Sequence, residues 1–311
     1  MRIETGLDLQ PDARAVVTTG TFDGVHLGHQ EIVRYLVDRA RAIDGVPTVV
    51  SFDPHPREVL TGEPVPLLTT VDERAELLRQ LGVERFVVVP FTHDVSRLDP
   101  EDYVRDILMG RVGLREIVIG YDHRFGRARA GDRSTLDRLG AAHGFSVDVI
   151  PEHSEQGATV SSSRIRRQLE DDGDAQGARA LLGRPYALSG TVVAGERRGR
   201  TIGFPTANLQ LVDARKLVPA KGVYAVQAEL ATGERAGGMM NVGVRPTVDT
   251  SGRLSIETHL FAFEGDLYGQ TLRVELVDRL RDERAFDGLD GLVAQLNEDR
   301  RQAKEALAGL A

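Results

Sequence analysis

Short β-rich runs alternate with helical patterns over the first 119 residues, and this alternation constrains the fold most. Runs rich in Val, Ile and Thr, each bounded by Gly, Pro or Asp, predict buried strands over residues 14–19, 46–52, 85–90 and 115–119. Apolar residues at helical spacing predict helices over residues 30–43, 72–81 (with Asp72 as the N-cap) and 100–109. Such alternation is typical of a parallel sheet covered by helices. We therefore predict an α/β N-terminal domain with a Rossmann-like parallel sheet.

The pattern changes beyond residue 186. Strand-like runs then recur at short intervals, over residues 187–194, 222–230, 236–244, 253–263 and 271–279, before one strong helix over 288–308. Such spacing predicts a C-terminal antiparallel β-barrel or sandwich closed by a terminal helix. Two short helices precede it, 164–170, capped by Ser162 or Ser163, and 174–182, ended by Gly183. We expect domains at residues 1–183 and 184–311.

Composition and charge exclude several classes of protein. Hydrophobic residues make up 41% and charged residues 28% of the chain, as in globular domains that fold in water. The net charge of −8 argues against a general nucleic-acid or membrane surface. The chain has no cysteine, which rules out disulfides, thiolate metal sites and thiol nucleophiles. No apolar run is long enough to span a bilayer and the N-terminus does not read as a signal peptide, so we expect a cytoplasmic protein without nucleic-acid or membrane partners.

Residues 20–29 (GTFDGVHLGH) stand where a predicted strand turns into a predicted helix. Backbone N–H groups at a helix N-terminus favour anions, and His26 and His29 beside Gly28 add directed donors, so a polyphosphate would suit this turn. The chain contains neither a GxxxxGK[ST] nor a GxGxxG motif, and the imidazoles would have to replace the P-loop lysine. Histidines at this spacing are also common as metal ligands or as solvated residues, and the spacing alone leaves these alternatives open.

Two further turns directly follow predicted strands, residues 51–56 (SFDPHP) and 120–126 (GYDHRFG). Ligands of parallel sheets bind beyond the carboxyl ends of the strands, so these turns and the histidine turn should line one rim. Asp53, His55 and Asp122 would equally suit ordinary turns, in which short polar side chains bond their own backbone.

A further phosphate candidate is the serine- and arginine-rich segment over residues 161–167 (SSSRIRR). Its hydroxyls, the N–H groups of the following helix and a guanidinium could bind β- and γ-phosphates. The alternative is a capped surface helix whose arginines are solvated.

The first motif of the second half is the glycine-rich stretch over residues 195–208. Glycines let a backbone wrap closely around a phosphate. Thr206 and Asn208 offer two neutral oxygens, which suit a Mg²⁺ ion that already carries nucleotide phosphates. The alternative is a long hairpin loop.

The second motif of this half is a carboxylate within a predicted strand. Glu257 should share a strand face with Ser255 and His259, and the opposite face should carry Leu254, Ile256 and Leu260. A carboxylate in this place could take a proton from a hydroxyl as a general base. It could equally be a solvated residue of the outer face.

Taken together, these strings resemble the bifunctional bacterial riboflavin kinase/FMN adenylyltransferases, also called FAD synthetases, over nearly the whole chain. The N-terminal half carries GTFDGVHLGH (20–29), SFDPHP (51–56), GYDHRFGR (120–127) and SSSRIR (161–166). The C-terminal half carries GRTIGFPTAN (199–208), KGVYAV (221–226), NVGVRPT (241–247) and ETHLFAFEGDLYG (257–269). Two positions depart from the family's usual pattern: Ser163 stands where a threonine is usual, and His123 where a phenylalanine is frequent.

The resemblance implies an N-terminal nucleotidyltransferase domain that adenylylates FMN to FAD with ATP and releases pyrophosphate. His26 and His29 would be its catalytic donors to phosphate oxygens. The implied nucleotide- and phosphate-binding residues are Gly20, Phe22, Asp23, Gly28, Ser161, Ser162, Ser163 and Arg166. The implied flavin-binding residues are Phe52, Pro54, Pro56, Asp122 and Phe125.

The resemblance also implies a C-terminal riboflavin kinase domain that makes FMN from riboflavin and ATP. Glu257 would take the proton of the ribityl 5′-hydroxyl, and Thr206 and Asn208 would hold Mg²⁺. The implied nucleotide-binding residues of the glycine-rich loop are Gly195, Gly199, Arg200 and Gly203. The partners would be riboflavin, FMN, FAD and ATP as co-substrate. Two alternatives are an adenylyltransferase whose barrel only senses flavin, and a flavin carrier without turnover.

Overall fold

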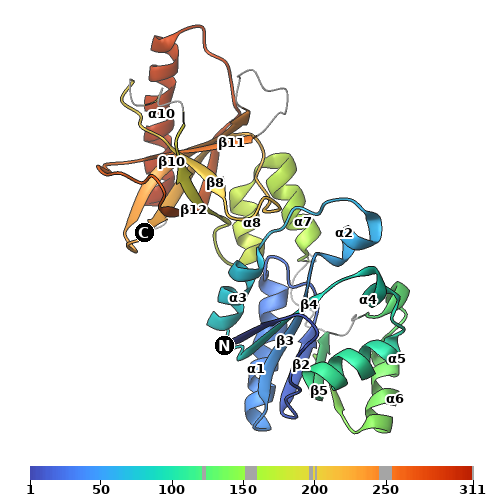
Figure 1. Ribbon diagram of the computed structural model, residues 1–311. Coiled ribbons are helices and arrows are strands. Elements are labelled where there is room, and N and C mark those ends of the chain that lie inside the picture. The colour runs from blue at the N-terminus through green and yellow to red at the C-terminus, as the bar shows by residue number, and fades with distance from the viewer. Residues whose placement is uncertain (121–123, 151–159, 196–198, 200–201, 245–253, 310–311) are drawn as a thin grey trace. The chain divides into compact units, whose positions relative to one another are not determined.

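The computed structural model describes residues 1–120, 124–150, 160–195, 199, 202–244 and 254–309, which form two compact units, Met1–Ser161 and Ser162–Ala311 (Figure 1). Each unit has a sheet of its own. The helices over residues 162–182 group with the second unit, and the domain boundary between residues 183 and 184 stays a prediction.

The first unit is built on a six-stranded parallel sheet. Its strands are β1 (Arg2–Thr5), β2 (Ala15–Thr19), β3 (Val46–Asp53), β4 (Arg85–Pro90), β5 (Leu114–Gly120) and β6 (Ser146–Ile150). They lie in the order β1-β4-β3-β2-β5-β6, and each neighbouring pair is parallel, which confirms the α/β prediction. The sequence analysis missed β1 and β6 because these edge strands are largely exposed or half-buried and mix polar with apolar residues.

The helices of this unit are α1 (Leu27–Ala42), α2 (Pro56–Thr61), α3 (Val71–Gln80), α4 (His93–Arg97), α5 (Pro100–Asp102), the π-helix η1 (Tyr103–Val112), the 3₁₀ turn η2 (Arg127–Arg129) and α6 (Arg133–His143). The prediction of Asp72 as an N-cap is wrong. Thr70 caps α3, because its hydroxyl accepts from the Glu73 N–H while the Glu73 carboxylate accepts from the Thr70 N–H. The helix predicted over residues 100–109 is present as the short helix α5 followed directly by the π-helix η1.

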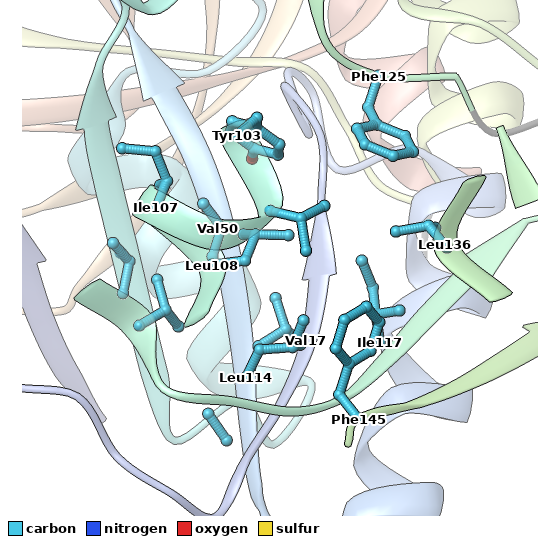
Figure 2. Packing of buried hydrophobic residues seen from close by; sticks show 14 of the residues in the cluster. Val17, Val50, Tyr103, Ile107, Leu108, Leu114, Ile117, Phe125, Leu136 and Phe145 are labelled. Carbon is cyan, nitrogen blue, oxygen red and sulfur yellow. The ribbon is translucent and has the colours of Figure 1, made fainter. Parts of the chain in front are cut away.

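Both faces of the central strands β2, β3, β4 and β5 are largely buried, which explains their apolar runs. Neighbouring residues of β2 pack in different clusters, as the alternation of a strand requires. Val16 packs with residues of α1 and α3, whereas Val17 packs with residues of η1 and α6. Figure 2 shows the cluster that contains Val17, with Leu108, Ile117 and Leu136 among its labelled members.

The order of the strands reverses beside β2. From β2 the chain moves outward through β3 and β4 on one side, and then returns to add β5 and β6 on the other. Crevices of doubly wound sheets open at such a reversal, beyond the carboxyl ends of the two strands that flank it. The segments after β2 and β5 are therefore placed to form a binding site.

The second unit begins with α7 (Ser162–Arg167), the π-helix η3 (Gln168–Asp172) and α8 (Ala175–Leu182). The helix predicted over residues 164–170 begins earlier, at Ser162, so that Ser162 and Ser163, predicted as its cap, lie within its first turn. Gly183 ends α8 in the left-handed conformation (φ 70°), as predicted, where a residue with a Cβ would be strained.

The second unit continues as a closed antiparallel barrel with a C-terminal helix, as predicted. Its strands are β7 (Ala187–Val193), β8 (Ala207–Leu211), β9 (Gly222–Leu230), β10 (Arg235–Val244), β11 (Leu254–Leu260) and β12 (Thr271–Arg281), in the order β10-β11-β8-β7-β12-β9. The helix α10 (Leu289–Ala308) packs Ala303 and Leu307 against a cluster that includes Phe204, Met239 and Val277.

Candidate active sites

A cavity of about 430 Å³ opens in the first unit where the strand order reverses. The segments that follow strands supply much of its lining: Gly20, Thr21 and Phe22 after β2, Phe52 and Pro56 at the end of β3, and Gly120, Arg124, Phe125 and Gly126 at the end of β5. Described residues of all three predicted turns therefore line one cavity, as expected.

The two histidines of the 20–29 motif stack on each other at the start of α1. Their ring centroids lie 3.6 Å apart with the planes 16° from parallel. His26 is buried and caps the helix, since its Nδ1 accepts from the His29 N–H at 3.3 Å. His29 lines the cavity and contacts the Phe22 ring at a centroid distance of 5.0 Å. The motif thus places one imidazole as a support and the other at the cavity wall.

The surroundings of His29 favour its neutral form. Burial lowers its pKa well below the ordinary 6.5, and the neighbouring His26 and the positive charge of Arg74 lower it further. Its Nδ1 is buried and has no hydrogen-bond partner among the residues that the structure describes. A buried polar atom without a partner costs free energy, so the environment of this ring is an unfavourable one.

Aromatic side chains form another part of this cavity. Phe52 meets Phe91 edge to face at 5.4 Å, and Tyr103 lies between Phe52 and Phe125 at 6.5 and 6.2 Å. The Tyr103 hydroxyl lies 2.8 Å from the Thr19 hydroxyl, and burial raises its pKa to about 12. Such a surface suits a flat aromatic ligand. Sequence analysis missed Phe91 and Tyr103; the i, i+4 spacing of Tyr103 and Ile107 on a predicted helix was the available signal.

The remaining residues predicted for this site have mixed positions. Asp23 is fully buried, and its carboxylate is bonded within the protein. Pro54 follows a cis peptide and lies outside the cavity lining, while Asp122 falls outside the described residues. His55 caps α2 through its Nδ1, in keeping with the turn alternative. Residues 161–166 fall at the junction of the two units, and their role in phosphate binding stays a prediction.

In the barrel, strand register brings the candidate kinase residues together. Glu257 on β11 is the register partner of Asn208 on β8 and of Asn241 on β10. Thr206, just before β8, donates a hydrogen bond of 3.2 Å from its hydroxyl to Oε2 of Glu257. The short strand β8, whose first two residues belong to the glycine-rich stretch, was not predicted from the sequence. Its pairing with β11 makes these residues neighbours.

Two cavities meet at Thr206. The larger, of about 290 Å³, has both polar and apolar lining. Its polar residues include Asn241, Glu257, His259, Arg281, Glu283 and Arg284, and its apolar residues are Ile202, Phe204, Val223, Met239, Met240, Phe286, Leu292 and Leu296. The smaller, of about 80 Å³, includes Pro205, Ala207, Thr258, Asp266 and Tyr268 in its lining. Alternating strand residues point to opposite faces, so Glu257 and Thr258 face different cavities while Thr206 lines both.

The predicted faces of β11 are only partly right. Leu254, expected on the apolar face, is 45% exposed, whereas Ser255 is 8% exposed. Glu257 is half-buried at a cavity rather than solvated on an outer face. The Ser255 hydroxyl bonds the Gly243 carbonyl of the neighbouring strand β10 and is buried there. His259 approaches the Pro205 carbonyl at 2.8 Å through Nδ1, and burial lowers its pKa although this hydrogen bond raises it.

Two glycines of the 195–208 stretch are required by close packing. A Cβ at Gly195 would lie 2.2 Å from Nδ2 of Asn208, and one at Gly199 would lie 2.1 Å from the Phe204 carbonyl oxygen. Gly203 is left-handed (φ 82°) with open space around it. Arg200 falls outside the described residues. The backbone at Gly195 therefore lies directly against the Asn208 amide.

The donor set at this position fits a magnesium ion. Thr206, Asn208 and Glu257 offer a hydroxyl, an amide and a carboxylate oxygen within one patch of paired strands. Mg²⁺ prefers such oxygen donors and usually takes only a few from the protein, with phosphates and waters completing its octahedron.

Comparison with known proteins finds two family models, which match successive parts of the chain. The FAD synthetase family model matches residues 8–164 and the riboflavin kinase model matches residues 182–307. The bifunctional riboflavin kinase/FMN adenylyltransferase of Escherichia coli K12 is 38% identical over 96% of this chain and 95% of its own. The enzyme of the same description from Bacillus subtilis is 36% identical over 94% and 93%.

A solved structure from Streptococcus pneumoniae, described as a macrolide-efflux protein, has a TM-score of 0.85 and 33% identity and covers 96% of each chain. That description concerns the pneumococcal protein. Across the described part of this chain, every helix is too short or too polar to cross a membrane.

Proposed function

This chain belongs to the bifunctional riboflavin kinase/FMN adenylyltransferase family, and we propose that its barrel cavities and its sheet cavity are the places of the two reactions. It phosphorylates riboflavin to FMN and adenylylates FMN to FAD, with ATP as the co-substrate. The observation that supports the kinase site most is the hydrogen bond between Thr206 and Glu257, at the place where the two barrel cavities meet.

For the kinase reaction, the larger barrel cavity takes riboflavin and the smaller takes the ATP phosphates. The larger has Phe204, Phe286 and Leu292 in its lining, which suits the isoalloxazine ring. Glu257 accepts the proton of the ribityl 5′-hydroxyl. That oxygen then forms a bond to the γ-phosphorus as the bond to the bridging oxygen breaks, which gives FMN and ADP.

Thr206 and Asn208 are the residues that would hold Mg²⁺ in this reaction. The ion, when bound, supplies positive charge to the phosphate oxygens. The Thr206 hydroxyl also orients the Glu257 carboxylate, so the base and the cation site share one residue. The backbone at Gly195 lies against the Asn208 amide and would cover the nucleotide, whereas Gly199 lines the larger cavity.

For the adenylyl transfer, the sheet cavity takes FMN and a second ATP. The flavin ring packs against Phe52, Tyr103 and Phe125. A phosphate oxygen of FMN attacks the α-phosphorus of ATP in line, and pyrophosphate leaves. His29, supported by His26, donates to the phosphate oxygens where charge grows. Positioning and charge stabilisation are sufficient for such a transfer, so no covalent enzyme intermediate is required.

Filling the larger barrel cavity tests its assignment to riboflavin. Leu292→Trp should raise the KM for riboflavin by at least about tenfold, equivalent to about 1.4 kcal/mol, while the KM for ATP changes less than about twofold. Leu289→Trp is the matched control, since Leu289 lies on the same helix with 67% exposure. Equal effects of Leu292→Trp on both substrates would contradict the assignment.

A further inference from the structure

The loop that leads to His26 has an unfavourable backbone conformation. Phe22 (φ 48°) and Val25 (φ 39°) are left-handed although neither is glycine, and Gly24 between them is left-handed as well (φ 84°). Non-glycine residues are strained in this region and persist there only when their surroundings impose the conformation. Contacts from outside the loop must therefore hold it in place.

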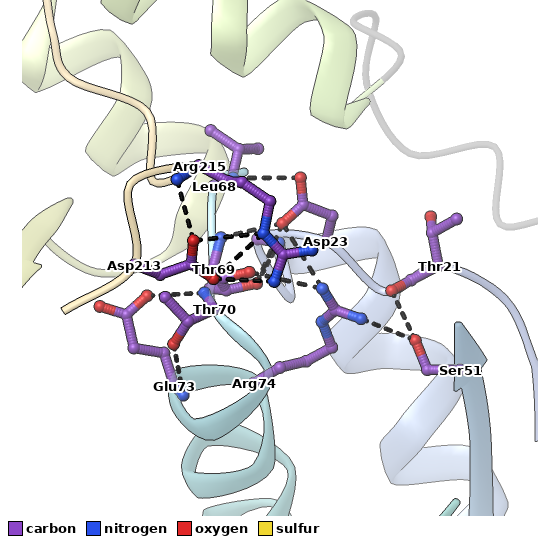
Figure 3. Close-up of polar contacts among 11 residues, drawn as sticks. Thr21, Asp23, Ser51, Leu68, Thr69, Thr70, Glu73, Arg74, Asp213 and Arg215 are labelled. Atoms are coloured by element: carbon purple, nitrogen blue, oxygen red, sulfur yellow. Dashed lines mark hydrogen bonds and ion pairs between the residues drawn. The ribbon is translucent and has the colours of Figure 1, made fainter. Parts of the chain in front are cut away.

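The segment before α3 supplies such contacts, and Thr69 bonds the loop through both its side chain and its backbone (Figure 3). The Thr69 hydroxyl donates to Oδ1 of Asp23 at 3.1 Å and accepts from the Gly24 N–H at 2.9 Å. The Asp23 carboxylate also accepts from the backbone N–H groups of Thr69 (2.8 Å) and Leu68 (3.1 Å). One hydroxyl thus bonds both the side chain and the backbone of the loop.

Arg74 supports the same loop from α3. Its side chain is 2% exposed, and its Nη1 donates to the Ser51 hydroxyl at 2.8 Å, which donates in turn to the Thr21 carbonyl at 2.8 Å (Figure 3). Its Nη2 lies 3.4 Å from the Thr69 carbonyl oxygen and 4.0 Å from Oδ1 of Asp23. The guanidinium therefore offsets the buried negative charge and links the beginning of the loop to its middle.

The loop that this network holds is in direct contact with both histidines. The loop ends at His26, which caps α1, and Phe22 within the loop contacts the ring of His29. Displacement of a reacting group by about 1 Å can cost about 10² in rate. A loop that relaxed to ordinary backbone angles would shift both histidines.

We propose that Thr69 and Arg74 are positioning residues for adenylyl transfer, which keep the strained 21–25 loop and hence His26 and His29 in place. The inference rests on the proposed role of the histidines. It also gives Asp23 a new role: its buried carboxylate anchors the loop instead of meeting the nucleotide.

The test compares Thr69→Val with Thr69→Ser in the full chain. Valine keeps the shape of threonine and removes both hydrogen bonds of the hydroxyl, whereas serine keeps them. We expect Thr69→Val to lower kcat for FAD formation from FMN and ATP by a factor of about 10–10², while KM for FMN changes less than about threefold. Thr69→Ser should keep most of the parent kcat. Equal kcat values for the two variants would overturn the proposal.

Arg74→Gln and His29→Ala complete the experiment. Arg74→Gln removes the charge opposite Asp23 and should lower the same kcat by about 10–10², again with little change in KM. A variant that instead loses FMN binding and its cooperative unfolding transition would indicate a purely structural role and overturn the proposal.

His29→Ala distinguishes the failure of the positioning role from the failure of the proposed function. If His29→Ala keeps full FAD formation, the proposed function of the histidines fails. If His29→Ala is inactive and Thr69→Val is fully active, the positioning role alone fails.

Discussion

The hydroxyl of Thr206 donates to Oε2 of Glu257 at 3.2 Å, between the segment that enters β8 and the middle of β11. Thr206 lines both barrel cavities and Glu257 lines the larger. The residue that we assign to the cation therefore also fixes the orientation of the residue that we assign as the base. Changes at Thr206 should affect both, and they should leave the reaction of the other unit intact.

Thr206→Val should lower FMN formation by about 10² and raise the Mg²⁺ concentration needed for half-maximal rate, because it removes a donor to Glu257 and an oxygen for the cation. Thr206→Ser keeps the hydroxyl and should lie close to the parent protein. Initial rates of FMN formation across a Mg²⁺ titration check this. An unchanged Mg²⁺ dependence in Thr206→Val would remove the residue from the cation site.

His29→Ala should lower FAD formation from supplied FMN by about 10²–10³, the usual cost of losing one well-aimed donor, while riboflavin phosphorylation persists. His93→Ala is the matched control, because His93 is an exposed histidine at the start of α4 in the same unit. Chromatographic separation of FMN and FAD gives both rates from one reaction. Comparable FAD formation by the two variants would contradict the assignment of His29.

Stability should depend on pH through His29. Its pKa is lowered in the folded protein, so below about pH 6.5 the unfolded chain binds a proton that the folded chain does not. The free energy of unfolding should therefore fall as pH falls from about 6.5 toward the folded pKa, by at most about 1.4 kcal/mol per pH unit for this group. Urea unfolding at several pH values should show a smaller acid loss for His29→Gln than for the parent. Parallel curves for the two proteins would contradict a lowered pKa at His29.

Short-range sequence patterns predict the helices and strands that begin or end at a characteristic residue. The strand over residues 222–230 was predicted at its observed bounds. The end of α8 was predicted from Gly183, because glycine readily adopts the left-handed conformation that ends this helix. Buried parallel strands were recognised for a related reason, since their runs stay apolar when both faces of the sheet are covered.

Features that depend on distant partners could not be predicted in this way. β8 is recognisable as a strand through its pairing with β7 and β11. The role of Asp23 depends on Thr69, a residue 46 positions away that belongs to no motif of the sequence. Tyr103 reaches the cavity through η1, and its position became clear once Phe52 and Phe125 were placed around it.

The most direct test of the account measures FMN and FAD formation by Glu257→Gln in parallel. Glutamine keeps the shape of the side chain but is not a base, so FMN formation from riboflavin should fall by about 10²–10⁴ while FAD formation from supplied FMN stays at the parent rate. Glu229→Gln, at an exposed position of β9, is the control and should change neither rate. FMN formation by Glu257→Gln at the parent rate, or an equal loss of both activities in a folded protein, would contradict the account.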